Sequence, residues 1–171
     1  MAGNFLTANG PFQAVQSTIA ASHSAIEDVY RAHGDRIWRA VWAFAQDPDV
    51  ASDAVAEAFA QALARGSAIR SPKAWIWRAA FRIAGGMLQQ RSRTVSLDRR
   101  GSYEMTDPNG ELVWALQKLP KNQRAAVILF YYADHPVREV AAILDSSVIA
   151  VRVNLSRGRK RLRQILGTSH A

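Results

Sequence analysis

Apolar residues recur every three or four positions along most of the chain, the spacing that places side chains on one face of an α-helix. The first helix is predicted to begin at Ile26 and to end before Asp47 and Pro48, because the residue preceding a proline is displaced from helical backbone angles. Asp49 is placed to cap a second helix that ends at Gly66. The predicted buried stripe of this second helix is Val55, Phe59, Ala62 and Leu63.

A third helix is predicted after Ser71, because Pro72 suits the first position of a helix. The pair Gly85 and Gly86 lowers the helical propensity by about 1 kcal/mol per residue relative to alanine, so a bend or a helix boundary is expected there. One face of this helix carries Trp75, Ala79, Ile83 and Met87. A polar stretch rich in Arg, Asp, Asn and Gly follows and predicts a linker.

The C-terminal part predicts shorter helices separated by prolines and polar turns. The first of them ends before a proline, the second covers residues 121–133 with Tyr131 or Tyr132 facing inward, and the third opens at Pro136. A long last helix is expected over residues 147–166. No segment shows sustained alternation with a period of two, so the chain is predicted to be all-α.

We expect two small helical domains joined by a polar linker. The first domain comprises residues 25–92, the linker residues 93–110 and the second domain residues 111–167. Residues 1–24 are rich in Ala, Ser, Thr, Gln, Asn and Gly without a clean period, and they predict a flexible N-terminal extension. Residues 168–171 form a short tail. Either domain alone would bury only a modest core, because small domains bury a smaller share of their surface.

The composition of the 171-residue chain excludes several classes of function. The absence of cysteine excludes disulfide frameworks, thiolate nucleophiles and metal sites built on cysteine. The chain has no apolar run of about 18 residues and no secretory signal, so we expect a cytoplasmic protein without membrane insertion. Its four histidines are scattered along the chain: His23, His33, His135 and His170. We expect none of them to form a metal or acid–base site with a carboxylate one helical turn away. We therefore expect no catalytic residue, metal or cofactor.

Positive charge is concentrated in particular segments. The chain has 22 Lys and Arg against 14 Asp and Glu, a net charge of +8. Residues 112–171 hold ten basic and three acidic residues, whereas residues 27–59 hold seven acidic ones. A clustered basic surface favours a polyanionic partner, most often nucleic acid. The acidic segment is either a protein-binding surface or a solvated helix face.

The last two predicted helices have the layout of a helix-turn-helix, in which a short helix, a tight turn and a longer basic helix follow one another. Ser147 in the turn can cap the longer helix, and no acidic residue follows Asp145. The basic residues of the longer helix are Arg152, Arg157, Arg159, Lys160, Arg161 and Arg163. In such motifs the first residues of the second helix meet base edges and the later cations meet phosphates. A solvated basic helix on a bundle is the alternative.

Particular segments resemble the sigma factors of bacterial RNA polymerase. In the C-terminal half, the resemblance to sigma region four lies in residues 119–124 (LPKNQR), 131–132, 137–144 (VREVAAIL) and 151–162. In the N-terminal half the resemblance is to sigma region two. Residues 30–42 resemble its opening helix, residues 51–59 its polymerase-binding helix and residues 73–80 its promoter-melting helix. The resemblance spans residues 26–166 in the correct order, without intervening modules. This organisation is similar to the extracytoplasmic-function (ECF) group of the sigma-70 family.

The resemblance implies roles for residues of the N-terminal half. Asp53 and Glu57, four positions apart on one helix face, would dock on core RNA polymerase. The residues that would contact unpaired minus-ten DNA are Trp77, Arg78, Phe81 and Arg82. Trp75 is expected in the core, whereas Trp77 and Phe81 are expected to be exposed for stacking on bases.

On the last helix, the resemblance places four residues against the bases of the minus-thirty-five element: Arg152, Val153, Ser156 and Arg157. Arg159, Lys160 and Arg161 lie further along, where phosphate contacts are expected. Because Val153 and Ser156 are small, we expect few polar base contacts and a greater dependence on DNA shape. The chain departs from the pattern common in relatives at Ala56, Arg82, Gly86, Asp145, Ile149 and Ala150.

As an ECF sigma factor, the chain would bind core RNA polymerase and promoter DNA and direct initiation at a stress- or signal-responsive set of genes. The polymerase would supply the chemistry. An anti-sigma factor is a further partner class that the family includes, although no residue of the chain identifies one. Two alternatives stay open at this point: a helix-turn-helix transcriptional regulator without sigma activity, and an enzyme acting on nucleic acid.

Overall fold

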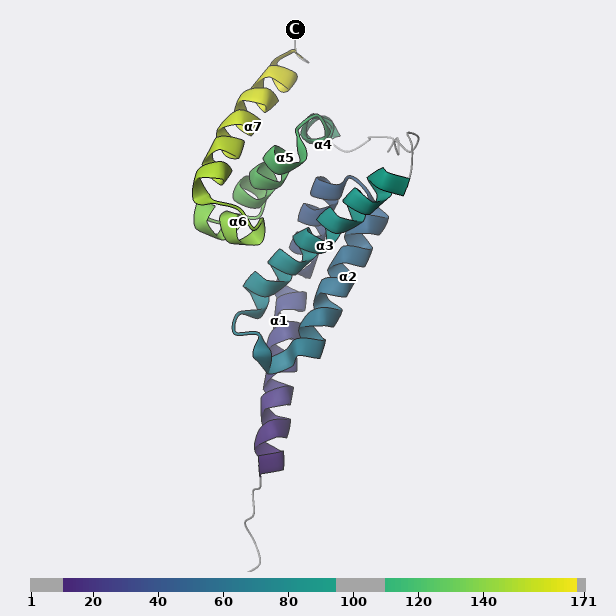
Figure 1. Ribbon diagram of the computed structural model, residues 1–171, viewed down its shortest axis with the longest axis vertical. Helices are drawn as coiled ribbons and strands as arrows, with labels where there is room; N and C mark the ends of the chain where they lie inside the picture. The colour runs from purple at the N-terminus through teal and green to yellow at the C-terminus, as the bar shows by residue number, and fades with distance from the viewer. Residues whose placement is uncertain (1–10, 95–109, 169–171) are drawn as a thin grey trace, which may run out of the picture.

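The computed structural model describes residues 11–94 and 110–168 (Figure 1). Within these ranges all regular structure is helical, which confirms the all-α prediction. In chain order the elements are α1 (Pro11–Ala45), α2 (Pro48–Arg65), the 3₁₀ turn η1 (Gly66–Ala68), α3 (Pro72–Thr94), α4 (Gly110–Gln117), α5 (Lys121–Val127), the π-helical turn η2 (Ile128–Tyr132), α6 (Val137–Ile143) and α7 (Val148–Thr168). None of these helices is both long and apolar enough to cross a membrane.

Helices α1, α2 and α3 pack side by side in one bundle, and α4 to α7 form a second group that lies against α3 (Figure 1). The largest buried apolar residues of the bundle include Ile37, Val41, Val50, Ile76 and Trp77. Those of the second group include Leu129, Val140 and Val151. Both sets belong to one continuous apolar core, so each group is completed by contact with the other. The predicted domain boundaries themselves stay a prediction.

Helix α1 begins at Pro11, well before the predicted start at Ile26. The flexible extension expected for residues 1–24 is therefore wrong for residues 11–24, while residues 1–10 lie outside the described residues. Residues 12–25 contain no glycine or proline, and lengthening an existing helix needs no new nucleus. Figure 1 shows this purple part of α1 projecting past the ends of α2 and α3.

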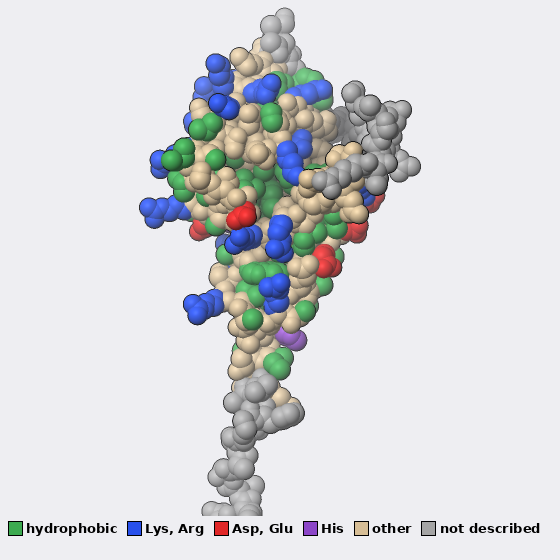
Figure 2. Space-filling model, viewed as in Figure 1, with side chains coloured by type: hydrophobic (Ala, Val, Ile, Leu, Met, Phe, Trp, Pro, Cys, Tyr) green, Lys and Arg blue, Asp and Glu red, His purple; other side chains and the backbone are tan. Residues whose placement is uncertain are grey.

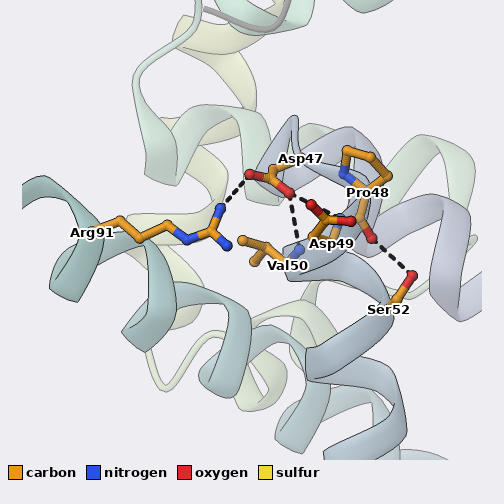
Figure 3. A network of polar contacts seen from close by, with 6 residues as sticks. All are labelled: Asp47, Pro48, Asp49, Val50, Ser52 and Arg91. Atoms are coloured by element: carbon orange, nitrogen blue, oxygen red, sulfur yellow. Dashed lines mark hydrogen bonds and ion pairs between the residues drawn. The ribbon is translucent and has the colours of Figure 1, made fainter. Parts of the chain in front are cut away.

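The connection from α1 to α2 is capped by Asp47 and not, as predicted, by Asp49 (Figure 3). One Asp47 carboxylate oxygen accepts hydrogen bonds from the backbone N–H of Asp49 at 2.9 Å and of Val50 at 3.0 Å. The other oxygen pairs with the guanidinium of Arg91 from α3. The cap lies earlier than predicted because Pro48 already occupies the first helical position.

Helix α3 continues through Gly85 and Gly86, so the helix boundary expected as one possibility there does not occur. Both long faces of α3 pack on other helices, and this packing outweighs the propensity cost of the two glycines. At Gly85 the Nζ of Lys121 from α5 donates a hydrogen bond to the backbone carbonyl oxygen at 3.0 Å. Gly85 therefore lies at a contact between the two groups of helices.

Three predicted core positions of the chain are exposed. Leu63 of the predicted α2 stripe is 44% exposed. Neither Tyr131 nor Tyr132 faces inward, since they are 53% and 44% exposed. The reason lies in η2, where the N–H of Ala133 bonds to the carbonyl of Ile128 at 3.0 Å, five residues back. This wider turn changes the helical period and leaves the tyrosines on the outside.

Candidate nucleic-acid interface

Helix α7 buries one face and exposes the other. Its buried stripe is formed by Val151, Leu155 and Gly158. All of its predicted DNA-binding residues are exposed: Arg152, Val153, Ser156, Arg157, Arg159, Lys160 and Arg161. With 3.6 residues per turn, Val153, Ser156 and Lys160 lie opposite the buried stripe, and Arg152 and Arg157 lie on either side of them. Figure 2 shows Lys and Arg side chains over this helix and over the neighbouring part of α3.

The turn before α7 fixes where the exposed face begins. Asp145 has a positive φ of 50°, a conformation in which relatives often place glycine. The next residue, Ser146, donates its N–H to the carbonyl of Ala141 at 2.9 Å and closes the end of α6. Ser147 caps α7 as predicted, since its Oγ accepts a hydrogen bond from the N–H of Ala150 at 3.0 Å. The first turn of α7 is thus anchored by its backbone, and its outward side chains are left in solvent.

Two side chains of α7 differ from the predicted pattern. Arg159 has an intramolecular partner, because its Nη1 donates to the hydroxyl of Tyr131 at 3.3 Å. Ile149, in the first turn, is 74% exposed, more than any other large apolar side chain of the described residues. It was not among the predicted DNA-binding residues. The signal that could have found it was its place in the first turn of the last predicted helix, at a position where the chain departs from the family pattern.

The expectation that Trp77 and Phe81 are exposed is wrong. Trp77 is 1% exposed and Phe81 is 3% exposed. The Trp77 ring lies edge to face with the His135 ring, with centroids 4.7 Å apart, and the Phe81 ring lies 5.2 Å from that of Phe44 in α1. The face of α3 that was expected to meet bases is covered on one side by α1 and on the other by the start of α6. Neither ring is available for stacking in this arrangement.

The exposed residues of α3 lie around this covered face. Arg78 and Arg82 are exposed, and the Nη2 of Arg78 lies 3.2 Å from the carboxylate Oδ1 of Asp145 in the helix-turn-helix turn. Trp75, expected in the core, is only half-buried, and the guanidinium of Arg65 lies 5.4 Å from its ring centre. A cleft of about 310 Å³ separates the start of α3 from α6, and Trp75 and Arg78 help to line it.

The predicted polymerase-binding residues share the solvent face of α2. Asp53 and Glu57 are both exposed, and the Glu57 carboxylate accepts a hydrogen bond from Gln61 Nε2 at 2.7 Å. Ala56 lies exposed beside them, while Ala54 and the residues behind it are buried against α1 and α3. The structure therefore brings the two carboxylates to one surface, far from the basic face of α7 along the fold.

The histidines correct one sequence-based expectation. His135 does have a carboxylate one helical turn away, since its Nδ1 lies 2.8 Å from Glu139 Oε2. No group of three metal-ligating side chains occurs in the described parts of the chain. Burial lowers the pKa of His33, and the nearby positive charges of Lys73 and Arg36 lower it further. These histidines lie where the two groups of helices meet, not in a catalytic cluster.

Part of the chain matches a known protein family, and most of it is similar to curated proteins. The family described as "Sigma-70, region 4" matches residues 110–162, which contain the helix-turn-helix. The RNA polymerase sigma factor SigV of Bacillus subtilis is 26% identical over 144 residues, covering 77% of this chain and 84% of its relative. The ECF RNA polymerase sigma factor SigE of Mycolicibacterium smegmatis is 26% identical over 157 residues, covering 82% of this chain and 61% of its relative.

Two solved structures share the fold. The sigma factor RpoE in complex with the anti-sigma factor NepR from Bartonella quintana superposes with a TM-score of 0.65 and 18% identity, covering 91% of this chain and 96% of that one. The structure of CnrH in complex with the cytosolic domain of CnrY gives a TM-score of 0.69 and 20% identity, covering 90% and 94%. The region-four match and the sigma-factor relatives agree in what this chain is similar to: residues 110–162 match sigma-70 region 4, and the curated relatives over most of its length are RNA polymerase sigma factors, one of them of the ECF group.

Proposed function

We propose that the chain is a sigma factor that binds core RNA polymerase in the cytoplasm and directs transcription from specific promoters. The observation that carries the proposal is the exposed basic face of α7, which follows a capped helix-turn-helix turn inside the segment that matches sigma region four. Arg152 and Arg157 on its first turns suit base edges, and Lys160 and Arg161 suit phosphates. The polymerase supplies the chemistry, so the chain itself needs no catalytic residue or cofactor. The promoters belong to a stress- or signal-responsive set of genes.

The polymerase contact is assigned to the solvent face of α2. Asp53 and Glu57 are exposed there and are not engaged with α1 or α3. Two carboxylates one turn apart form a compact negative patch that a basic surface of the polymerase can meet. Ala56 is exposed beside them. This placement leaves α7 free to reach DNA while α2 is bound.

On α3, only accessible side chains can contact unpaired minus-ten DNA. We assign this contact to Arg78, Arg82 and the half-buried Trp75, which combine charge with an aromatic surface. Arg78 must leave Asp145 before it can meet a phosphate. Melting of the promoter is therefore coupled to movement of α6 and α7 away from α3, which also removes His135 from the ring of Trp77.

An anti-sigma factor is assigned as a further partner. Of the two solved structures with this fold, one is described as a sigma factor in complex with an anti-sigma factor, and the other as CnrH in complex with the cytosolic domain of CnrY. The contact between α3 and α6 holds the two groups of helices in one arrangement. Such a partner could bind the chain in this arrangement. Co-purification of the chain with a small protein that also blocks its binding to core polymerase is the expected observation.

Run-off transcription with purified core polymerase and a library of genomic promoters tests the proposal. Added chain is expected to start transcription at a small set of promoters that core polymerase alone ignores. The double variant Asp53→Ala, Glu57→Ala should weaken core binding in a fluorescence titration without changing thermal unfolding. Asp35→Ala, which removes an exposed acid from α1, is the matched control and should bind like the parent chain. Specific DNA binding without any core binding would instead favour a helix-turn-helix regulator without sigma activity.

A further inference from the structure

The outermost line of α7 begins with two exposed aliphatic side chains. Ile149 is 74% exposed and Val153, one turn further on, is 41% exposed. Val148 beside them packs against the core, whereas Ile149 and Val153 do not belong to it. A single exposed apolar residue is ordinary on a protein surface, but these two are adjacent on a face whose other large side chains are cationic.

The position of this aliphatic pair matters as much as its exposure. Ile149 lies in the first turn of α7, directly after the Ser147 cap, and the first turns of a recognition helix approach base edges most closely. Arg152 and Arg157 flank the pair, so the same face carries the charge that draws a duplex toward it. The pair would therefore face the floor of a major groove, with cations on both sides of it.

An aliphatic side chain can distinguish bases in only one way. It neither donates nor accepts hydrogen bonds, so it cannot read the edges of guanine, adenine or cytosine. Thymine alone presents a methyl group in the major groove, and apolar side chains contact that group. A methyl group buried against isoleucine or valine leaves water, which makes the contact favourable.

We propose that Ile149 and Val153 form a thymine-methyl reader at the start of the recognition helix. The inference rests on the proposed function, namely that α7 enters the major groove of promoter DNA. It assigns the aliphatic pair the task of selecting thymines within the minus-thirty-five element, next to bases read by Arg152. It also gives a role to Ile149, one of the positions at which this chain departs from the pattern common in relatives.

The test removes the methyl group alone. In a promoter found by run-off transcription, each thymine of the minus-thirty-five element is replaced in turn by deoxyuridine, and holoenzyme binding is measured. At one or two positions the affinity should fall about fourfold, the factor expected for one methyl-sized apolar group. Ile149→Ala or Val153→Ala should make binding insensitive to one of these replacements. Ile19→Ala, which truncates an exposed isoleucine on α1 away from the assigned DNA and polymerase surfaces, is the control and should keep the full effect.

The outcomes separate this inference from the function on which it rests. If specific binding is found but every deoxyuridine substitution is neutral, or if the effect persists in both α7 variants, methyl reading is wrong and the sigma assignment stands. If no promoter responds, the sigma assignment fails, and the same substitutions are made in duplexes selected from a random pool by the full chain. Absence of binding there overturns the inference too. Thermal unfolding of Ile149→Ala should match the parent chain, because the side chain is exposed.

Discussion

Trp75 and Trp77 lie two positions apart on α3 and meet different surroundings. Trp77 is enclosed by His135 and Phe81, whereas Trp75 stays half-buried beneath Arg65. Their order was predicted the other way round, because a helical stripe indicates which side chains share a face but not how many helices cover it. For single residues, burial is therefore decided by neighbours that are distant in the chain.

This difference predicts opposite phenotypes for the two tryptophans. Trp77→Ala should lower the free energy of unfolding by about 3–5 kcal/mol, the usual cost of removing a buried tryptophan. Trp75→Ala should cost much less and should instead reduce the reactivity of promoter thymines toward permanganate in the open complex. Urea unfolding and permanganate footprinting of both variants check this. A stability loss as large for Trp75→Ala as for Trp77→Ala would contradict the assignment.

The lowered pKa of His33 predicts that stability depends on pH. Burial and the charges of Lys73 and Arg36 disfavour the protonated ring in the folded chain, whereas the unfolded chain titrates near the ordinary value of 6.5. The contribution of neutral His33 is complete above that value and is lost as the pH falls through the lower folded pKa. Urea unfolding at about pH 5 and about pH 7.5 should show a smaller difference for His33→Gln than for the parent chain. Equal differences would show that other groups carry the dependence.

At the scale of elements, the periodic pattern predicts which helices form, whereas the exact helix ends depend on capping residues and on packing. The periodic pattern predicted α2, α3 and the helix-turn-helix, because their apolar stripes and turn residues are local. It missed the start of α1, since residues 11–24 contain no strong stripe and are helical as a continuation of a packed helix. It also misplaced the cap of α2, because Asp47 and Asp49 flank Pro48 and have the same side chain.

The cap assignment predicts unequal effects of two neighbouring aspartates. Asp47→Ala removes two hydrogen bonds to backbone N–H groups and the pair with Arg91, and should lower the free energy of unfolding by about 1 kcal/mol or somewhat more. Asp49→Ala removes only a favourable charge in the first turn and should cost less, about 0.3–1 kcal/mol. Thermal denaturation of both variants decides the matter, and the reverse order would restore Asp49 as the cap.

The packing of α5 on α7 depends on the absence of a side chain at Gly158. A Cβ there would lie 2.9 Å from the Cγ2 of Val127, so Gly158→Ala forces the helices apart and should cost about 1–3 kcal/mol. Gly86→Ala is the matched control, because nothing lies near its Cβ, and it should stabilise α3 by up to about 1 kcal/mol. Chemical denaturation gives both values. A stabilised Gly158→Ala chain would mean that the two helices are less tightly packed.

At the scale of the whole molecule, the contact between the two groups of helices was not predictable from the sequence. Arg78 and Asp145 are 67 residues apart in the chain, and no local pattern connects them. The predicted site residues of α7 are exposed, because its charges and turn are contiguous in the sequence, whereas Trp77 and Phe81 of α3 are covered by α1 and by the start of α6. The pair of Arg78 and Asp145 joins the turn before α7 to α3, so under the proposed function the two must separate before Arg78 can contact DNA.

The burial of Trp77 gives this separation an optical readout. Of the five tryptophans, only Trp77 is fully buried, and the ring of His135 lies against it. An indole ring in dry surroundings emits at shorter wavelength than one in water, so departure of α6 should shift the chain's intrinsic emission to the red. Titration with core polymerase and promoter DNA should produce that shift, and Trp77→Phe should abolish it. An unchanged spectrum on a productive promoter would show that transcription begins with the two groups of helices still in contact.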